Sequence, residues 1–308
     1  YYILSPREHR VEMGAENINR EENIMKNLLM ASASLALVAM AAPATAKHHA
    51  NDGAAMTDAS LQSVLSHERR AGDKPRDMYR HPAKTLSFFG VKPEHTVVEY
   101  GPGGGWYTRV LAPYLVASGQ YIAINADSSS SSFPDRAREA RTKGWPESFP
   151  ATAANWTGVD AGKILAFESD EMPDDMKGKV DRILIFRSLH GMLNGNRADS
   201  ELRALRDMLA DDGMVGVVQH RAKKDASYAM SNGTKGYLKQ ASVIALFELN
   251  GFELVSQSEI NANAKDTSDY DRGVWTLPPV LALGDSDKAK YEAIGESDRM
   301  TLLFKKRP

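Results

Sequence analysis

The sequence has 308 residues, of which 42% are hydrophobic and 25% are charged, which is the composition of a soluble globular protein. This balance excludes disorder of the whole chain, and the length suits one large domain or two modest ones. A formal net charge of −2 argues against nucleic acid as an obligatory partner, and the absence of cysteine excludes disulfides, thiolate catalysis and cysteine-ligated zinc or iron–sulfur clusters.

The N-terminal part carries the pattern of a bacterial secretory signal peptide. Lys26 supplies a positive charge, residues 28–42 form an apolar run, and Ala-Thr-Ala at 44–46 offers the small residues of a cleavage site. The apolar run has 15 residues, fewer than the roughly 20 that a membrane-spanning helix needs. The pattern therefore predicts cleavage after residue 46, with an uncleaved membrane anchor as the alternative.

This pattern divides the chain into four segments. We predict an upstream extension or longer n-region at 1–24, a signal peptide at 25–46, a flexible linker at 47–60 and a globular domain at 61–308. The mature chain would begin at Lys47, be periplasmic or secreted, and keep no stable membrane anchor. Mass spectrometry of the protein from its host tests that start.

Strand-like and helix-like segments alternate along the domain. The predicted strands are 96–100, 121–125, 164–167, 180–186, 214–218, 252–256 and 300–304. The predicted helices are 108–116, 198–210 and 242–249. This alternation predicts an α/β three-layer sandwich around a mostly parallel sheet. Residues 257–299 are long for a connection within such a sheet, so we predict a functional insertion there.

The most informative segment is E-x-G-x-G-x-G, between the first predicted strand and the first predicted helix. Its acid and glycines are Glu99, Gly101, Gly103 and Gly105. Glycine permits the positive φ angles and close backbone approach of a turn that cradles a ligand. The dinucleotide pattern G-x-G-x-x-G fails here in either register, and no Gly-Lys-Ser/Thr follows as in a P-loop.

This pattern resembles motif I of class I S-adenosylmethionine-dependent methyltransferases. Residues 61–304 further resemble a group of exported methyltransferase-like proteins of bacteria. The segments that carry this resemblance are RDMYRHP (76–82), GGGWY (103–107), FRSLH (186–190), Asp266 to Tyr270, GVWTLPP (273–279) and GESDRM (295–300). The resemblance implies a methyltransferase-like domain at 61–308, a seven-stranded sheet with an antiparallel last strand, and S-adenosylmethionine as cofactor.

The resemblance also implies roles for individual residues. The glycines would admit the amino-acid part of the cofactor, and Glu99 would help to position its ammonium group. Asn125 ends the second strand, where the family usually has an acid that contacts the ribose hydroxyls, and Asp127 follows two residues later. Asp170 matches the adenine-binding acid after the third strand, with an ordinary surface acid as the alternative.

Residues just after strands are the catalytic candidates, because ligands of open α/β sheets bind at the carboxyl ends of the strands. His190 is the first candidate for a base that accepts a proton from the acceptor, with a structural histidine as the alternative, and His220 is the second. Arg187 and Arg221 are candidates to neutralise an anionic acceptor, or else to form salt bridges. His81 is expected in an N-terminal lid over the pocket.

Other features bear on the acceptor. No Asn/Asp-Pro-Pro-Tyr/Phe follows the fourth strand, which with the nearly neutral charge favours a small-molecule acceptor over nucleic acid. No metal site is expected, because the histidines show no i, i+4 pairing and Asp127 with Asp170 alone does not define one. In the insertion, Trp275 either contacts the acceptor as part of a cover or packs the insertion onto the core.

Two functions are compatible with these features. The first is methyl transfer from S-adenosylmethionine to a small acceptor. The second is an exported, non-catalytic protein that keeps the fold and binds a nucleoside or S-adenosylhomocysteine. A cytoplasmic enzyme with a misread start is disfavoured, because it leaves the apolar run at 28–42 unexplained.

Overall fold

The fold is described from a computed structural model, in which residues 58–129 and 131–308 are described. The predicted segments 1–24 and 25–46 and most of the predicted linker lie outside these residues. The linker prediction is too long at its end, because helix α2 (Ala59–Ser66) already includes Ser60, whose N–H donates to the Asp58 carboxylate that caps the helix. Within the described ranges, no helix combines the length and apolar character needed to span a bilayer.

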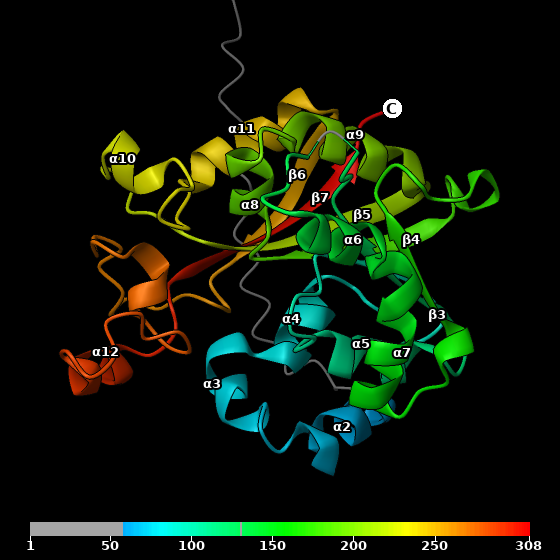
Figure 1. Ribbon diagram of the computed structural model, residues 1–308, viewed down its shortest axis with the longest axis horizontal. Helices are drawn as coiled ribbons and strands as arrows, with labels where there is room; N and C mark the ends of the chain where they lie inside the picture. The colour runs from blue at the N-terminus through cyan, green and yellow to red at the C-terminus, as the bar shows by residue number, and fades with distance from the viewer. Residues whose placement is uncertain (1–57, 130) are drawn as a thin grey trace, which may run out of the picture. The chain divides into compact units, whose positions relative to one another are not determined.

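Seven strands form one sheet in the order β3-β2-β1-β4-β5-β7-β6 (Figure 1). Their bounds are β1 Thr96–Tyr100, β2 Gln120–Asn125, β3 Ile164–Glu168, β4 Val180–Phe186, β5 Leu209–His220, β6 Phe252–Ser258 and β7 Arg299–Lys306. All neighbouring strands pair in parallel except β7, which is antiparallel to both β5 and β6. The predicted seven-stranded, mostly parallel sheet with an antiparallel last strand is confirmed.

Helices cover both faces of the sheet, which gives the predicted three layers (Figure 1). One face packs against α8 (Leu189–Asn194), α9 (Ala198–Met208) and α11 (Gln240–Leu249). The other packs against α2, α4 (Pro82–Phe88), α5 (Thr108–Leu115) and α7 (Trp145–Thr157). The remaining α-helices of the described part are α3 (Asp77–Arg80), α6 (Arg136–Lys143), α10 (Tyr228–Ser231) and α12 (Lys288–Ile294).

The predicted helix 198–210 is too long, and the predicted strand 214–218 is too short. The helix ends at Met208 and β5 begins at Leu209, so the turn-like residues before Met214 lie within a strand. The pairing of β5 with β4 shifts register at this point. A Cβ at Gly213 would lie 2.7 Å from the Val180 carbonyl oxygen, so glycine permits the close backbone approach at this irregularity.

Helices α6 and α7, between β2 and β3, were not predicted. The buried residues of α7 are Phe149, Ala153 and Thr157, which are spaced four apart. The same helix also contains Pro146 and Pro150. Pro146 is tolerated because the first turn of a helix has no intrahelical partner for its N–H. The prolines hide this helix from a reading of sequence periodicity.

The predicted insertion 257–299 is bounded by β6, which extends through Ser258, and by β7, which starts at Arg299. The buried carboxylate of Asp266 holds the insertion together and joins it to the domain. It accepts the backbone N–H of Asp298 within the insertion at 2.8 Å and the hydroxyl of Tyr237 from the domain at 3.1 Å. The insertion is therefore an ordered part of the domain, positioned beside the end of β5.

Candidate active site

The glycine turn after β1 has the left-handed backbone that the sequence predicts. Gly101, Gly103 and Gly105 have φ angles of 63°, 55° and 74°. A Cβ at Gly101 would lie 2.8 Å from Ser188 Oγ, and one at Gly105 would lie 2.3 Å from the ring of Trp156. At Gly103 the nearest atom would be 3.9 Å away. Packing thus excludes side chains at two of the glycines, whereas Gly103 faces open space.

Two cavities meet at this turn. The first, of about 390 Å³, is lined by Glu99 and the glycine turn together with residues after β4 and β5. The second, of about 290 Å³, is lined by Asn125 and Asp127 after β2. Both are lined by Gly101 and Ser188, so the two cavities adjoin at the carboxyl ends of β1 and β4. This is where an extended ligand has room on both sides of the glycine turn.

Glu99 is buried at the floor of the first cavity. The hydroxyls of Thr108 and Tyr121 donate to the same carboxylate oxygen, Oε2, at 2.8 and 2.6 Å. Burial raises the pKa of Glu99 to about 7, although these hydrogen bonds and the charges of Arg187 and Arg109 oppose that rise. A cation bound in the cavity would favour the ionised carboxylate.

Of the polar residues predicted to bind the cofactor after β2 and β3, Asp170 is the one that the structure places away from the cavities. Asn125 and Asp127 line the second cavity, but Asp170 is exposed and does not line it. Glu168 is the buried acid at the end of β3, and its Oε2 accepts the N–H of Ser128 at 2.8 Å. The structure therefore supports the surface-acid alternative for Asp170, and Glu168 is the acid that shapes the loop after β2.

The carboxylates of Asp127, Glu168 and Asp170 lie within 4.8 Å of one another. No metal site was expected from the sequence, and an acidic cluster of this kind does not by itself indicate one.

His190 and His220 come together in the first cavity, with their ring centres 5.9 Å apart. Burial lowers the pKa of His190, and burial with the charge of Arg299 holds the pKa of His220 well below its usual value. Both imidazoles are therefore neutral at pH 7.

The neighbours of the two rings differ. The Gln219 amide nitrogen donates to the Gly236 carbonyl at 2.8 Å and lies 3.4 Å from His190 Nδ1. This orientation makes Nδ1 of His190 an acceptor, so the hydrogen of the neutral ring is on Nε2. Nδ1 of His220 lies 2.6 Å from the hydroxyl of Ser297 in the insertion.

The two candidate arginines are separated by the fold. Arg187 lines the first cavity, whereas Arg221 does not. Arg221 forms ion pairs with Asp298 at 3.0 Å and Glu259 at 2.6 Å. The salt-bridge alternative therefore holds for Arg221.

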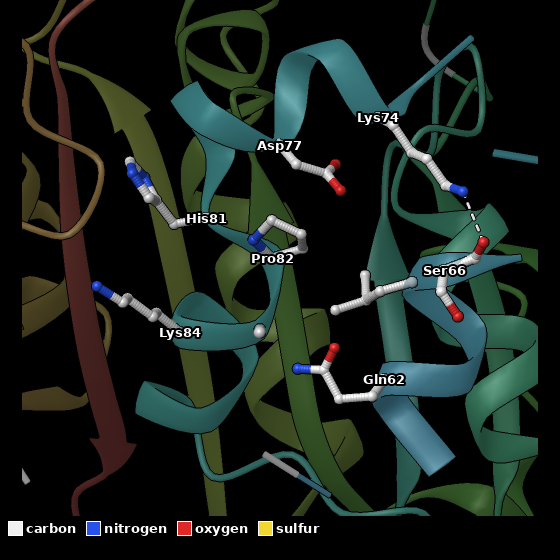
Figure 2. Close-up of a pocket in the computed structure, with 9 residues that line it drawn as sticks. Gln62, Ser66, Lys74, Asp77, His81, Pro82 and Lys84 are labelled. Atoms are coloured by element: carbon white, nitrogen blue, oxygen red, sulfur yellow. Dashed lines mark hydrogen bonds between the residues drawn. The ribbon is translucent and has the colours of Figure 1, made fainter. Parts of the chain in front are cut away.

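Residues from the N-terminal segment also reach this cavity, but His81 does not. Arg76 and Arg80 line the cavity, and both pair with Glu296 of the insertion. His81 lines a separate and larger cavity of about 550 Å³, which contains none of the glycine turn. Figure 2 shows that cavity, with His81 across from Gln62. The N-terminal segment therefore contributes Arg76 and Arg80 to this cavity, and His81 is not placed over it as expected.

Sequence reasoning missed the role of Glu296 altogether. Two of its partners, Arg76 and Arg80, lie about two hundred residues earlier, and no local pattern marks such pairs. The only sequence signal for this pairing is that segments 76–82 and 295–300 both carry the resemblance described above.

Trp275 lies at the rim of the first cavity, with 37% of its surface exposed and its ring edge-on to His190 at 6.0 Å. This position favours the cover alternative over a plug in the core.

Trp275→Ala is expected to lower the free energy of unfolding by much less than the roughly 3–5 kcal/mol of a buried aromatic truncation. Trp106→Ala is the matched comparison, since Trp106 is only 5% exposed and should show the full loss. Urea denaturation of both variants measures the difference. Equal losses would show that Trp275 is a core plug.

Comparison with known proteins gives only structural likeness. No protein-family model matches the sequence, and no curated protein matches it. A SAM dependent methyltransferase from Aquifex aeolicus is 17% identical, with a TM-score of 0.44 over 65% of this chain and 93% of that one. The 1,6-didemethyltoxoflavin-N1-methyltransferase of Burkholderia thailandensis, which has S-adenosylhomocysteine bound, is 14% identical, with a TM-score of 0.42 over 80% of this chain and 85% of that one.

The cyclase SpnF is also similar, at 14% identity and a TM-score of 0.43 over 74% of this chain and 80% of that one. At such low identities and scores, these likenesses do not indicate what this chain does.

Proposed function

We propose that this chain binds S-adenosylmethionine across the glycine turn and transfers its methyl group to a small acceptor. The observation that carries the proposal is the pair of adjoining cavities at Gly101 and Ser188, with a buried acid in one and polar residues in the other. A cofactor with an amino-acid part and a nucleoside part needs two such compartments on either side of a turn whose glycines leave room for it.

The residues present suit the cofactor's chemistry. Glu99 would hold the ammonium group, and the backbone at Gly103, where a Cβ would occupy open space, would lie against the amino-acid part. Asn125 and Asp127 would accept hydrogen bonds from the ribose hydroxyls. When bound, the cofactor supplies an electrophilic methyl group on a sulfonium.

The histidines would handle the acceptor's proton. We assign proton acceptance to His220, because a hydrogen on its Nδ1 donated to Ser297 leaves the lone pair on Nε2. His190 carries its hydrogen on Nε2 and would donate a hydrogen bond to the acceptor. Arg187 would face the acceptor's charge. As the reaction needs only a base and correct positioning of the nucleophile, these groups suffice.

The proposed export of the chain rests on the sequence pattern at 25–46, which lies outside the described residues. It leaves the exported binding protein as the alternative, which would bind S-adenosylhomocysteine without turning over S-adenosylmethionine.

Titration calorimetry with S-adenosylmethionine and S-adenosylhomocysteine tests the proposal. We expect saturable binding of both, and binding of neither at millimolar concentration would overturn it. Between about pH 5.5 and 7.5, affinity for S-adenosylhomocysteine should rise with pH and level off above about 7, because the free protein must ionise Glu99 to hold the ammonium group.

Glu99→Gln and 5′-methylthioadenosine are the controls for this pH dependence. The variant removes the titrating group, and the second ligand lacks the ammonium group, so each should give an affinity that does not change over this range. A pH dependence that persists in Glu99→Gln would assign it to another group.

A further inference from the structure

Glu296, which lines the first cavity, pairs with three arginines, and a fourth, Arg187, also lines the cavity. Glu296 accepts hydrogen bonds from Arg76 Nε at 2.6 Å and Arg80 Nε at 3.0 Å, and Arg299 Nη1 lies 3.1 Å from its carboxylate as an ion pair. Arg80, Arg299 and Glu296 are buried. One negative charge therefore serves three guanidinium groups, each of which stays protonated at neutral pH.

The fourth guanidinium, Arg187, has no carboxylate partner within the described ranges. Its Nη1 is buried without a hydrogen-bond partner, and so is Nη1 of Arg80. The other charges of the cavity do not offset this excess. Arg109 is already paired in bidentate fashion with Asp73. Burial raises the pKa of Glu99 to about 7, so this carboxyl is only partly ionised at neutral pH.

Arg187 is also held in a costly backbone conformation. It follows β4 with a φ of 58°, in the left-handed region that residues other than glycine and asparagine rarely adopt. An unpaired buried charge in a strained conformation is destabilising for the free protein. Strain and unpaired charge of this kind are typical of a position that contacts a ligand.

Aromatic side chains also line the cavity. The rings of Tyr107 and Phe186 stack with centres 3.4 Å apart, and the ring of Trp275 stands edge to face with that of His190. Aromatic walls of this kind fit a planar ligand body.

We propose that the acceptor is a small planar acid, whose carboxylate or phosphate contacts Arg187 and Arg80 while its flat body lies between the aromatic walls of the first cavity. Only the identification of this ligand as a methyl acceptor rests on the proposed function. The anion site itself does not depend on a methyl donor. A carboxylate could also come from the amino-acid part of the cofactor, and the experiment must separate these two sources.

The probes are benzoate and phenyl phosphate, with benzamide as a neutral control of the same shape, titrated with and without saturating S-adenosylhomocysteine. We expect both anions to bind in either condition, and benzamide to bind much more weakly. Arg187→Met should lower benzoate affinity by about tenfold or more, since it removes a charge-assisted contact. Arg187→Lys should retain part of it.

Arg203→Met is the matched control, because it removes the same charge from an exposed side chain on α9 and should leave benzoate affinity unchanged. Stability distinguishes a binding role from a structural one. Removing the unpaired guanidinium of Arg187 should leave the melting temperature equal to or above that of the wild type, whereas a structural arginine would show a loss.

The outcomes separate the proposals. Equal binding of benzoate and benzamide, or unchanged benzoate affinity in Arg187→Met, would overturn the anion site. Displacement of benzoate by S-adenosylhomocysteine but not by 5′-methylthioadenosine would assign Arg187 to the cofactor's carboxylate and overturn the acceptor proposal. If benzoate binds through Arg187 and S-adenosylhomocysteine never binds, the anion site stands and the proposed function falls.

Discussion

Replacing Gly103 by valine is expected to abolish binding of S-adenosylhomocysteine while the chain remains folded. The valine side chain would occupy the open space at Gly103, where the nearest atom lies 3.9 Å from the Cβ position. Its cost to the fold is the left-handed backbone, about 1–2 kcal/mol. For a domain of this size, each kcal/mol lowers the melting temperature by roughly 2–4 °C. Calorimetry and thermal melting measure the two effects.

Gly158→Val is the matched control for backbone strain. Gly158 has a φ of 71° with no atom within 4 Å of its Cβ position, and it ends α7 without lining either cavity of the glycine turn. It should lose similar stability and keep full affinity. A folded Gly103→Val variant that binds as tightly as the wild type would show that this glycine serves only the turn.

The sheet and the glycine turn were predictable because their signals are local. Strands such as β4 are runs of apolar residues buried on both faces, and an acid followed by alternating glycines marks a turn. Which of the glycines are required by packing was not predictable. Gly105 is required by Trp156, which comes from α7, a helix that the sequence pattern did not reveal.

The remainder of the site depends on contacts between distant segments. His81 stands one residue from Arg80, yet it lines another cavity, because the left-handed backbone at His81 turns the chain between α3 and α4. Arg187 and Arg221 look equivalent after their strands, and only the insertion decides that Arg221 is paired. Periodicity cannot report such partners, since each is fixed by tertiary packing.

Glu296→Gln is expected to lower the free energy of unfolding by about 3–5 kcal/mol at neutral pH, the usual loss when one partner of a buried ion pair is removed. The variant leaves three guanidinium groups without a countercharge. Glu253→Gln is the control, because Glu253 pairs with Lys305 at the half-exposed surface, and its loss should stay below about 1 kcal/mol. Urea denaturation of both variants tests this difference.

The pH dependence of stability identifies the cause of that loss. Burial alone would raise the pKa of Glu296, but the charges of Arg299, Arg80 and Arg76 outweigh it and hold that pKa below its usual value. The contribution of Glu296 is therefore complete above the unfolded pKa near 4.5 and is lost as the pH falls through the folded pKa. The gap between wild type and Glu296→Gln should close over that acid range.

The same substitution should strengthen binding of benzoate, because it raises the positive charge of the cavity that binds the anion. Bound anion should then restore part of the lost stability, since a ligand that binds only the folded state stabilises it by mass action. Glutamine at 296 would thus lower stability and raise anion affinity together. If benzoate affinity falls in parallel with stability, Glu296 organises the arginines as a scaffold and its charge does not limit anion binding.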